Sequence, residues 1–194
     1  MKTEFEAKFI NVDLISSRKQ LKKIGAKQTQ KMRTMRRAII ENSVMKQKNA
    51  FLRVRDEGNK VTLTYKQFND LSVDGAKEYE VVVSDFQETI DLLKVAGLPY
   101  RSFQESKRET WELDGAEIAL DEWPWLNPYV EIEGDSEPHV RNVSEQLGFD
   151  WIDAVFGDVM AAYRSQYPHL TEEDTVGNLL EVKFGDPLPE LLKK

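Results

Sequence analysis

Residues 4–8, Glu4-Phe5-Glu6-Ala7-Lys8, alternate strictly between polar and apolar side chains near the start of this 194-residue chain. Successive side chains of a β-strand point to opposite faces, so Glu4, Glu6 and Lys8 share one face while Phe5 and Ala7 share the other. The alternation therefore predicts a strand with a charged face. Such a face is either solvated or part of a binding site.

The same alternation returns in four further segments. Paired polar side chains occur in Leu52-Arg53-Val54-Arg55, in Val61 to Lys66, at Glu78 and Glu80, and at Glu131 and Glu133. The charges within a pair nearly always have one sign, and like charges on one strand face repel unless something bridges them. One interpretation is an open antiparallel sheet with a solvated polar face. The repetition favours the alternative, an α+β fold built on a closed or nearly closed antiparallel β-barrel with a polar lumen and helices packed outside.

Three amphipathic helices are predicted, each after one of the acidic strand pairs. They run from about Leu14 to Ile24, from an N-cap at Ser84 to before Gly97, and from after Ser136 to before Gly148. A fourth helix is expected over Trp151 to Gln166, and strands are expected over Arg37 to Asn42 and Ala50 to Arg55, joined through a loop. Asn69 to Gly75 is polar and rich in turn residues, so we expect a mobile loop there at the mouth of the site.

Length and composition limit the possible functions. At 22.5 kDa the chain suits one substantial domain, which we place at residues 1–170, followed by a C-terminal extension at 171–194. The chain has no cysteine and only two histidines, which argues against disulfides, thiolate metal sites and histidine-centred catalysis. A net charge of −7 argues against non-specific nucleic-acid binding. No apolar run approaches the ~20 residues of a membrane span and no signal peptide is evident, so we expect a cytoplasmic protein without membrane partners.

Taken together, the charged residues resemble the signature of the CYTH superfamily, the triphosphate tunnel group. That group includes class IV adenylyl cyclases, thiamine triphosphatases and inorganic triphosphatases. The resemblance extends from about Met1 to Tyr167 and rests on Glu4-x-Glu6-x-Lys8, Arg53-x-Arg55, Lys66, Glu78-x-Glu80, Lys107-Arg108 with Trp111, Asp121, and Glu131-x-Glu133. Any one of these elements is common by chance, whereas all of them in order indicate the family much more strongly than the substrate.

The acidic pairs are candidate metal ligands. Carboxylate oxygens are hard ligands that suit Mg or Mn, and such ions are usually held by one or two carboxylates together with the phosphates of a substrate. If the first and last acidic strands adjoin, Glu4, Glu6, Glu131 and Glu133 can share a metal. The family resemblance implies the same glutamates as metal ligands and adds Asp121.

The basic residues are candidates for holding a chain of phosphoryl groups, because arginine forks match phosphate oxygens and lysine acts as a point charge. The predicted substrate-binding set is Lys8, Arg37, Arg53, Arg55, Lys66, Glu78, Glu80, Lys107 and Arg108, and the predicted catalytic set is Glu4, Glu6, Lys8 and Lys66. Within the first set, Arg53 and Arg55 can also form salt bridges with the two glutamates. In a strand only one of Arg36 and Arg37 points inward, and the same holds for Lys107 and Arg108, where the resemblance favours Arg108.

Phosphoryl transfer requires positioning and charge neutralisation more than a covalent nucleophile. We therefore predict a Mg- or Mn-dependent hydrolase for a triphosphate-bearing small molecule, with inorganic triphosphate as first choice, acting as a monomer or homodimer. The first alternative is a class IV adenylyl cyclase, and the second is a non-catalytic polyphosphate- or nucleotide-binding module. Trp123 and Trp125 either stack an organic base at the mouth of the tunnel or pack a loop against helices.

Overall fold

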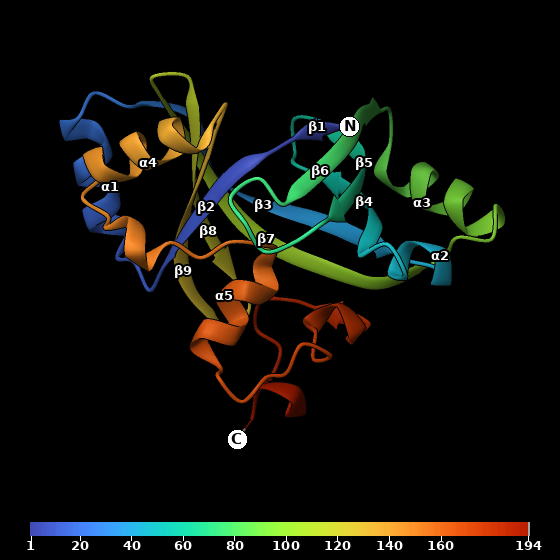
Figure 1. The fold of residues 1–194 in the computed structure, drawn as a ribbon. Coiled ribbons are helices and arrows are strands. Elements are labelled where there is room, and N and C mark those ends of the chain that lie inside the picture. The colour runs from blue at the N-terminus through green and yellow to red at the C-terminus, as the bar shows by residue number, and fades with distance from the viewer. Residues whose placement is uncertain (194) are drawn as a thin grey trace.

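The computed structural model describes residues 1–193. It confirms the α+β class and the nearly closed antiparallel barrel, with helices packed outside (Figure 1). The barrel strands are β1 (Lys2–Thr3), β2 (Phe5–Ile10), β3 (Lys27–Ile40), β4 (Ala50–Asp56), β5 (Val61–Phe68), β6 (Ala76–Val83), β7 (Tyr100–Leu113), β8 (Ala116–Trp123) and β9 (Leu126–Gly134). They pair in the order β1-β6-β5-β4-β3-β7-β8-β9-β2.

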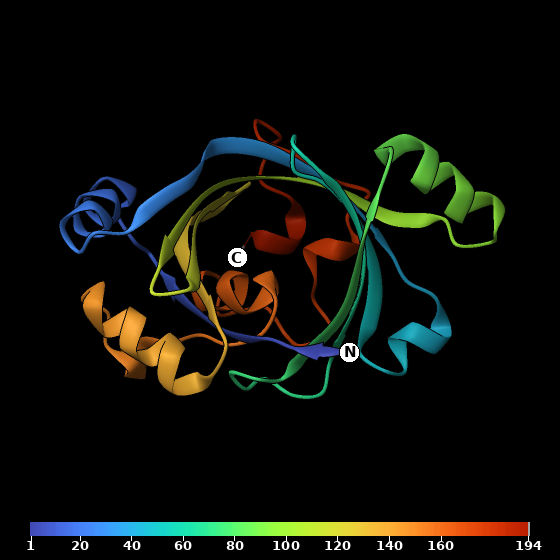
Figure 2. The same ribbon diagram turned by 90° about the horizontal axis from the view of Figure 1, so that it is seen from above.

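The N-terminal segment closes the barrel by pairing with both edges of the sheet. Lys2 of β1 lies opposite Glu78 of β6, and Phe5 of β2 lies opposite Gly134 of β9. Glu4 lies between the two strands, and its backbone N–H donates to the carbonyl of Ala76 at 3.0 Å. Figure 2 shows the strands curving around the barrel axis. The first charged residues of the chain are thereby fixed where the two sheet edges meet.

The helices that follow the acidic strands are α1 (Leu14–Lys23), α3 (Phe86–Val95) and α4 (Glu137–Gln146), as predicted. One detail was wrong, because the N-cap of α3 is Asp85 and not Ser84. Its carboxylate accepts a 2.7 Å hydrogen bond from the backbone N–H of Glu88, and an ionised cap of this kind also favours the positive end of the helix dipole.

The predicted helix over Trp151 to Gln166 is also wrong. A 3₁₀ turn at Trp151–Asp153 is followed by extended backbone, and helix α5 covers only Val159–Gln166. Val155 exchanges two backbone hydrogen bonds with Lys8 of β2, at 2.8 and 2.9 Å, and Gly157 has a φ of +103°. Both features are incompatible with a continuous helix, and neither can be read from local periodicity.

Two other segments differ from the expectation. The loop between β3 and β4 contains a short helix, α2 (Ser43–Lys46), and β3 begins ten residues before Arg37. The Asn69 to Gly75 segment is irregular, as expected, and is hydrogen-bonded to β2 where Glu6 N–H donates to the carbonyl of Val73 at 2.9 Å.

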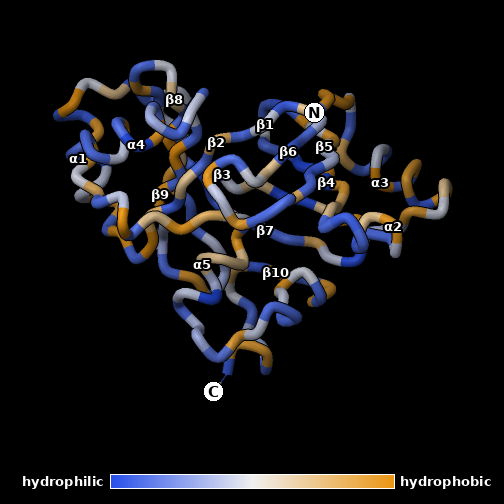
Figure 3. The backbone as a smooth tube through the Cα atoms, viewed as in Figure 1, coloured by the Kyte–Doolittle hydropathy of each residue, from blue (hydrophilic) through white to orange (hydrophobic). Residues whose placement is uncertain are grey.

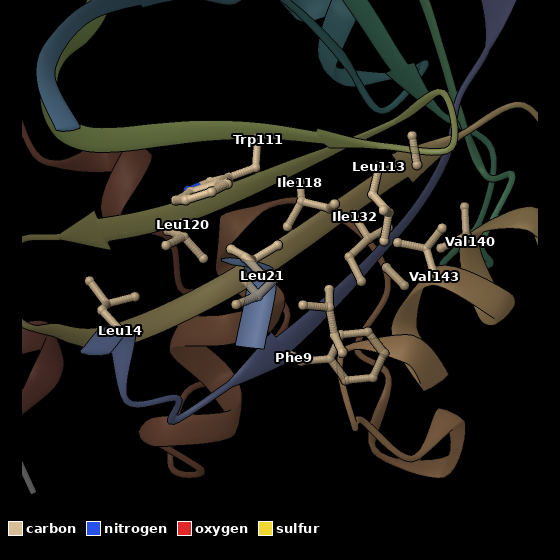
Figure 4. Close-up of a cluster of buried hydrophobic side chains, with 14 residues drawn as sticks. Phe9, Leu14, Leu21, Trp111, Leu113, Ile118, Leu120, Ile132, Val140 and Val143 are labelled. Carbon is tan, nitrogen blue, oxygen red and sulfur yellow. The ribbon is translucent and has the colours of Figure 1, made fainter. Parts of the chain in front are cut away.

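The largest apolar core lies on the outer side of the barrel, between the strands and helices α1 and α4. Figure 4 shows Phe9, Leu21, Ile118, Ile132 and Val143 meeting there, and all five are buried. Figure 3 shows polar and apolar residues interleaved along the barrel strands, as their alternation requires. Because the apolar faces are covered from outside, the polar faces are left to line the interior.

The C-terminal segment packs against the barrel. Strand β10 (Glu181–Val182) pairs in parallel with β7 at Phe103 and Gln104, and short 3₁₀ turns cover Val176–Asn178 and Glu190–Leu192. Val182 is fully buried in a second apolar cluster. None of the helices in residues 1–193 is long and apolar enough to cross a membrane.

Candidate functional site

The polar faces of the strands enclose a cavity of about 1010 Å³ inside the barrel. The predicted site residues that line it are Glu4, Glu6, Lys8, Arg37, Arg53, Arg55, Lys66, Glu78, Glu80, Arg108, Glu131 and Glu133. These residues come from seven separate strands and from the β1–β2 junction. The barrel thus gathers charges that lie up to 130 residues apart in the sequence around one cavity.

The first and last acidic strands are neighbours. In the β2–β9 pairing, Glu6 lies opposite Glu133 and Lys8 lies opposite Glu131. The next strand, β8, places Glu117 opposite Glu133, so carboxylates of three strands follow one another across this wall. Glu117 also lines the cavity. It was missed from the sequence, although it shares a strand face with Asp121 and could have been found by the same alternation.

Two lysines lie among these carboxylates. Lys66 Nζ is 2.6 Å from Glu4 and 3.6 Å from Glu6. Lys8 Nζ is 3.0 Å from Glu6, 3.1 Å from Glu131 and 2.6 Å from the carbonyl oxygen of Gly157. Burial alone would lower the pKa of Lys8, but the Glu6 and Glu131 carboxylates raise it above its ordinary value. Lysines from other positions therefore relieve part of the like-charge repulsion seen along single strands.

The relief is incomplete. Burial and the neighbouring Glu4 carboxylate raise the pKa of Glu78 to about 7. Burial and the same carboxylate also raise the pKa of Glu133, although the Lys2 ammonium opposes this from 3.3 Å. These two shifts mark a place in the cavity where an additional cation would be favourable.

The opposite imbalance occurs at the arginines. Burial and the neighbouring guanidinium groups of Arg53 and Arg55 lower the pKa of Arg37 to about 9, and burial and Arg55 lower the pKa of Arg53 to about 10. The Nε atoms of all three arginines are buried and have no hydrogen-bond partner among residues 1–193. This is a cluster of cations with too few anionic partners.

Salt bridges account for only part of this cluster. Arg53 and Arg55 approach Glu80 at 3.8 and 3.9 Å, which agrees with the expected cross-strand pairing. Arg55 makes its closest ion pair, at 2.6 Å, with Glu57. Arg37 donates a 2.7 Å hydrogen bond to the hydroxyl of Ser106, which carries no charge.

Arg108 is held differently from the other arginines. Its Nε and Nη2 atoms lie 2.7 and 2.5 Å from the two carboxylate oxygens of Asp121, and Nη2 is also 2.8 Å from Glu131. Burial alone would lower the pKa of Arg108, but these two carboxylates raise it well above its ordinary value. Both oxygens of Asp121 are engaged by Arg108 and this residue is only 1% exposed, which favours a supporting role for it; metal binding by Asp121 stays a prediction.

Strand alternation decides the inward residue in each basic pair. Arg37 and Arg108 face the cavity, whereas Arg36 pairs on the outside with Asp56 at 2.5 Å. Lys107 was included in the predicted substrate-binding set, but its Nζ lies outside the barrel, 4.6 Å from the centre of the Phe184 ring. Lys107 is therefore corrected to an outer-face residue.

The two tryptophans of the β8–β9 turn are packed. The Arg37 guanidinium lies 4.4 Å from the ring centre of Trp123, which is buried. The indole N–H of Trp125 donates to the carbonyl of Asp186 in the C-terminal segment at 2.9 Å. Their packing roles agree with the second of the two interpretations of this motif.

Asp158 was not found from the sequence. It is the N-cap of α5, lines the cavity next to Gly157, and has a pKa raised by burial. Its position depends on the pairing of Val155 with β2, so no local signal pointed to it.

The acidic wall fits a divalent cation only in combination with a phosphate-bearing ligand. Among residues 1–193, no three aspartate, glutamate or histidine side chains converge into a preformed metal site. Mg²⁺ is commonly bound through one or two carboxylates plus substrate phosphates, and the crowded Glu131 and Glu133 supply oxygen ligands of that kind. The donor chemistry and the excess negative charge at Glu133 are therefore compatible with such an ion.

Comparisons with known proteins identify the family. A nearly closed barrel with a charged lumen defines the structural class, and a CYTH domain profile matches residues 3–150. The chain therefore belongs to the CYTH domain family, whose members include triphosphatases and adenylyl cyclases. A search of curated protein sequences finds no match.

Solved structures share the fold at low sequence identity. A conserved hypothetical protein from Pyrococcus furiosus is 22% identical with a TM-score of 0.66, over 78% of this chain and 94% of the other. A candidate adenylate cyclase from Vibrio parahaemolyticus is 11% identical with a TM-score of 0.71, over 82% and 96%. HpAC1 from Hippeastrum, a candidate adenylyl cyclase reported to have a dominant triphosphatase activity, is 14% identical with a TM-score of 0.56, over 84% and 96%. At these identities the comparison concerns the fold alone.

Proposed function

We propose that the protein hydrolyses a triphosphate-bearing small molecule in a metal-dependent reaction inside the barrel, with inorganic triphosphate as the first candidate. The observation that carries the proposal is the arginine cluster. Arg37, Arg53 and Arg55 line a cavity of about 1010 Å³ and have buried Nε atoms without a hydrogen-bond partner among residues 1–193. The lowered pKa of Arg37 and of Arg53 indicates too little negative charge nearby. A compact polyanion supplies the missing partners, and a chain of phosphates offers oxygen acceptors to several guanidinium forks.

The basic residues have different roles in this proposal. The three arginines bind the phosphate chain together with Arg108, whose orientation Asp121 fixes. Lys66 contacts Glu4 and faces the cavity, so its ammonium lies between the carboxylates and the bound phosphates. Lys8 is enclosed by Glu6, Glu131 and a backbone carbonyl, and it therefore holds the carboxylates in position more than it contacts substrate.

The acidic wall provides the second half of the chemistry. Glu131 and Glu133 would hold a Mg or Mn ion, which supplies charge neutralisation at the phosphoryl oxygens. Glu6 connects both lysines to this wall. Positioning and electrostatic stabilisation of this kind are the main requirements of phosphoryl transfer, which explains how a chain without cysteine can carry it out.

The hydrolase is favoured over a class IV adenylyl cyclase by the aromatic residues. A cyclase must hold the base so that the ribose hydroxyl is in line with the α-phosphorus, and an error of about 1 Å can reduce the rate on the order of a hundredfold. Trp123 is buried against Arg37, and Trp125 does not line the cavity. Phe51, Phe68 and Tyr129 also line the cavity, which keeps the cyclase as the second candidate.

The deciding experiment is incubation of the purified protein with inorganic triphosphate, thiamine triphosphate or ATP, each with Mg or Mn, followed by chromatography of the products. We expect orthophosphate from inorganic triphosphate and little cyclic AMP from ATP. Cyclic AMP and pyrophosphate as the main products, without turnover of inorganic triphosphate, would replace the hydrolase by the cyclase. Binding of all three compounds without turnover would favour the binding module.

A further inference from the structure

Glu57 is a buried carboxylate that the chemistry described so far does not use. It follows β4 in the turn Asp56-Glu57-Gly58-Asn59 and is only 6% exposed. It does not line the cavity, in contrast to its neighbour Arg55. Burying a charge is unfavourable unless it is paired, so the partners of Glu57 are informative.

These partners are arginines. Glu57 Oε1 lies 2.6 Å from Nη2 of Arg55, and Oε2 lies 3.4 Å from Nη2 of Arg33. The backbone carbonyl of Glu57 accepts a further hydrogen bond from Nε of Arg33 at 3.1 Å. Arg33 in turn donates through Nη1 to the backbone carbonyl of Arg108 at 3.2 Å and to the hydroxyl of Thr110 at 3.3 Å. One carboxylate thus connects the Arg55 guanidinium to the backbone at Arg108.

The contact constrains how Arg55 presents its guanidinium. Glu57 lies outside the cavity lining and forms an ion pair with Nη2, while Nε is buried without a hydrogen-bond partner among residues 1–193. A two-pronged contact to a phosphate requires the planar fork to keep one orientation, and small errors in position weaken such contacts strongly. Burial opposes ionisation of Glu57, but the charges of Arg55 and Lys60 outweigh it and lower the pKa of Glu57 below its ordinary value.

We propose that Glu57 is a positioning residue that aligns Arg55 and the Arg108 segment for binding of a phosphate chain. The inference rests on the proposed triphosphate site and assigns to Glu57 no contact with substrate. For the change in triphosphate affinity when the Glu57 charge is removed, it predicts the opposite sign to that expected from charge alone. Removing one negative charge next to the arginine cluster should tighten anion binding if charge alone matters, and should weaken it if Glu57 positions Arg55.

The test is the affinity of Glu57→Gln for inorganic triphosphate, measured by calorimetry with EDTA present to prevent turnover. The glutamine keeps the size of the side chain and loses the charge that fixes both arginines. We expect binding about tenfold weaker than in the wild type, which corresponds to about 1.4 kcal/mol. Equal or tighter binding by the variant would overturn the positioning role.

Two further variants make the result interpretable. Glu109→Gln is the matched control, because Glu109 is equally buried and ion-paired with Arg18 at 2.9 Å, but it lies outside the cavity lining and should leave triphosphate affinity unchanged. If Glu57→Gln does not fold, Glu57→Asp keeps the charge and withdraws the carboxylate by one methylene, so weaker binding is again expected and wild-type affinity would refute the role. Failure of the wild type to bind triphosphate would instead refute the proposed function itself.

Discussion

Replacing Arg37 by methionine should separate stability from ligand binding. Arg37 is 8% exposed, contacts no carboxylate among residues 1–193, and its pKa is lowered from an ordinary 12.5 to about 9. At about 1.36 kcal/mol for each pKa unit, keeping this guanidinium charged in the folded protein costs about 5 kcal/mol. At pH 7 the side chain is charged in both the folded and the unfolded state, so the whole cost lowers the stability of the ligand-free protein.

Removing the Arg37 charge therefore stabilises the ligand-free protein, but the substitution also removes favourable contacts that offset part of this effect. Arg37→Met removes the cation–π contact with Trp123 and the hydrogen bond to Ser106, which together contribute about 2 to 4 kcal/mol. The methionine side chain can still pack against the indole ring. The net expectation is a ligand-free protein more stable by about 1 to 3 kcal/mol, or a Tm higher by about 3 to 10 °C for a chain of this size.

Triphosphate binding should change in the opposite direction. A hydrogen bond to a charged group contributes about 1.5 to 3 kcal/mol, so the loss of Arg37 should weaken binding by about ten- to a hundredfold. Thermal unfolding with and without inorganic triphosphate, together with calorimetry, measures both quantities. The control is Arg36→Met, because Arg36 is the adjacent residue on the outer face and should leave triphosphate affinity unchanged. A lower ligand-free Tm for Arg37→Met, or an unchanged affinity, would refute the reasoning.

Three other outcomes are expected. Arg55→Ala should weaken triphosphate binding about tenfold or more in calorimetry. Arg55→Lys should recover only part of the lost affinity, because a point charge cannot replace a two-pronged contact. Equal affinity in the wild type and both variants would place Arg55 outside the site. Glu133→Gln should leave the Tm unchanged or higher while abolishing metal-dependent turnover, and full activity in this variant would contradict the metal-binding role. The pKa of Glu78 is raised from 4.5 to about 7 in the folded protein, so its contribution to stability is lost as the pH rises between these values. Glu78→Gln should therefore be more stable than wild type at pH 7.5, and the difference should vanish toward pH 4.5. A constant difference in Tm across this range would be inconsistent with the shift.

The orientation of the site residues could be predicted from the sequence because it depends on local geometry. The pleat of a strand fixes which side chains share a face, so only one of Arg36 and Arg37, and one of Lys107 and Arg108, could point toward the lumen. The structure shows which member of each pair that is, with Arg37 and Arg108 lining the cavity and Lys107 on the outer face. The barrel itself could be inferred because charged faces recurred on several strands while their opposite faces were apolar.

The pairing of charges could not be predicted in this way because it depends on closure of the barrel. Lys66 contacts Glu4 across 62 positions of sequence, and Lys8 contacts Glu131 across 123. Asp158 reaches the cavity only because Val155 pairs with β2, an interaction that overrides the helical pattern of that segment. Like-charge pairs along single strands therefore indicated residues that line one cavity, whereas the partners of each charge were a property of the folded chain.

The remaining imbalance of charge suggests why both kinds of residue are retained in one cavity. The arginine side has too little negative charge, as the lowered pKa of Arg37 and Arg53 indicates, and the acidic side has too much, as the raised pKa of Glu78 and Glu133 indicates. Neutralising one side by mutation would stabilise the empty barrel but remove half of the binding site. A phosphate chain accompanied by a divalent cation satisfies both sides at once, and each then improves the environment of the other. This unequal distribution of charge around the cavity is thus the physical basis of the ligand chemistry proposed for it.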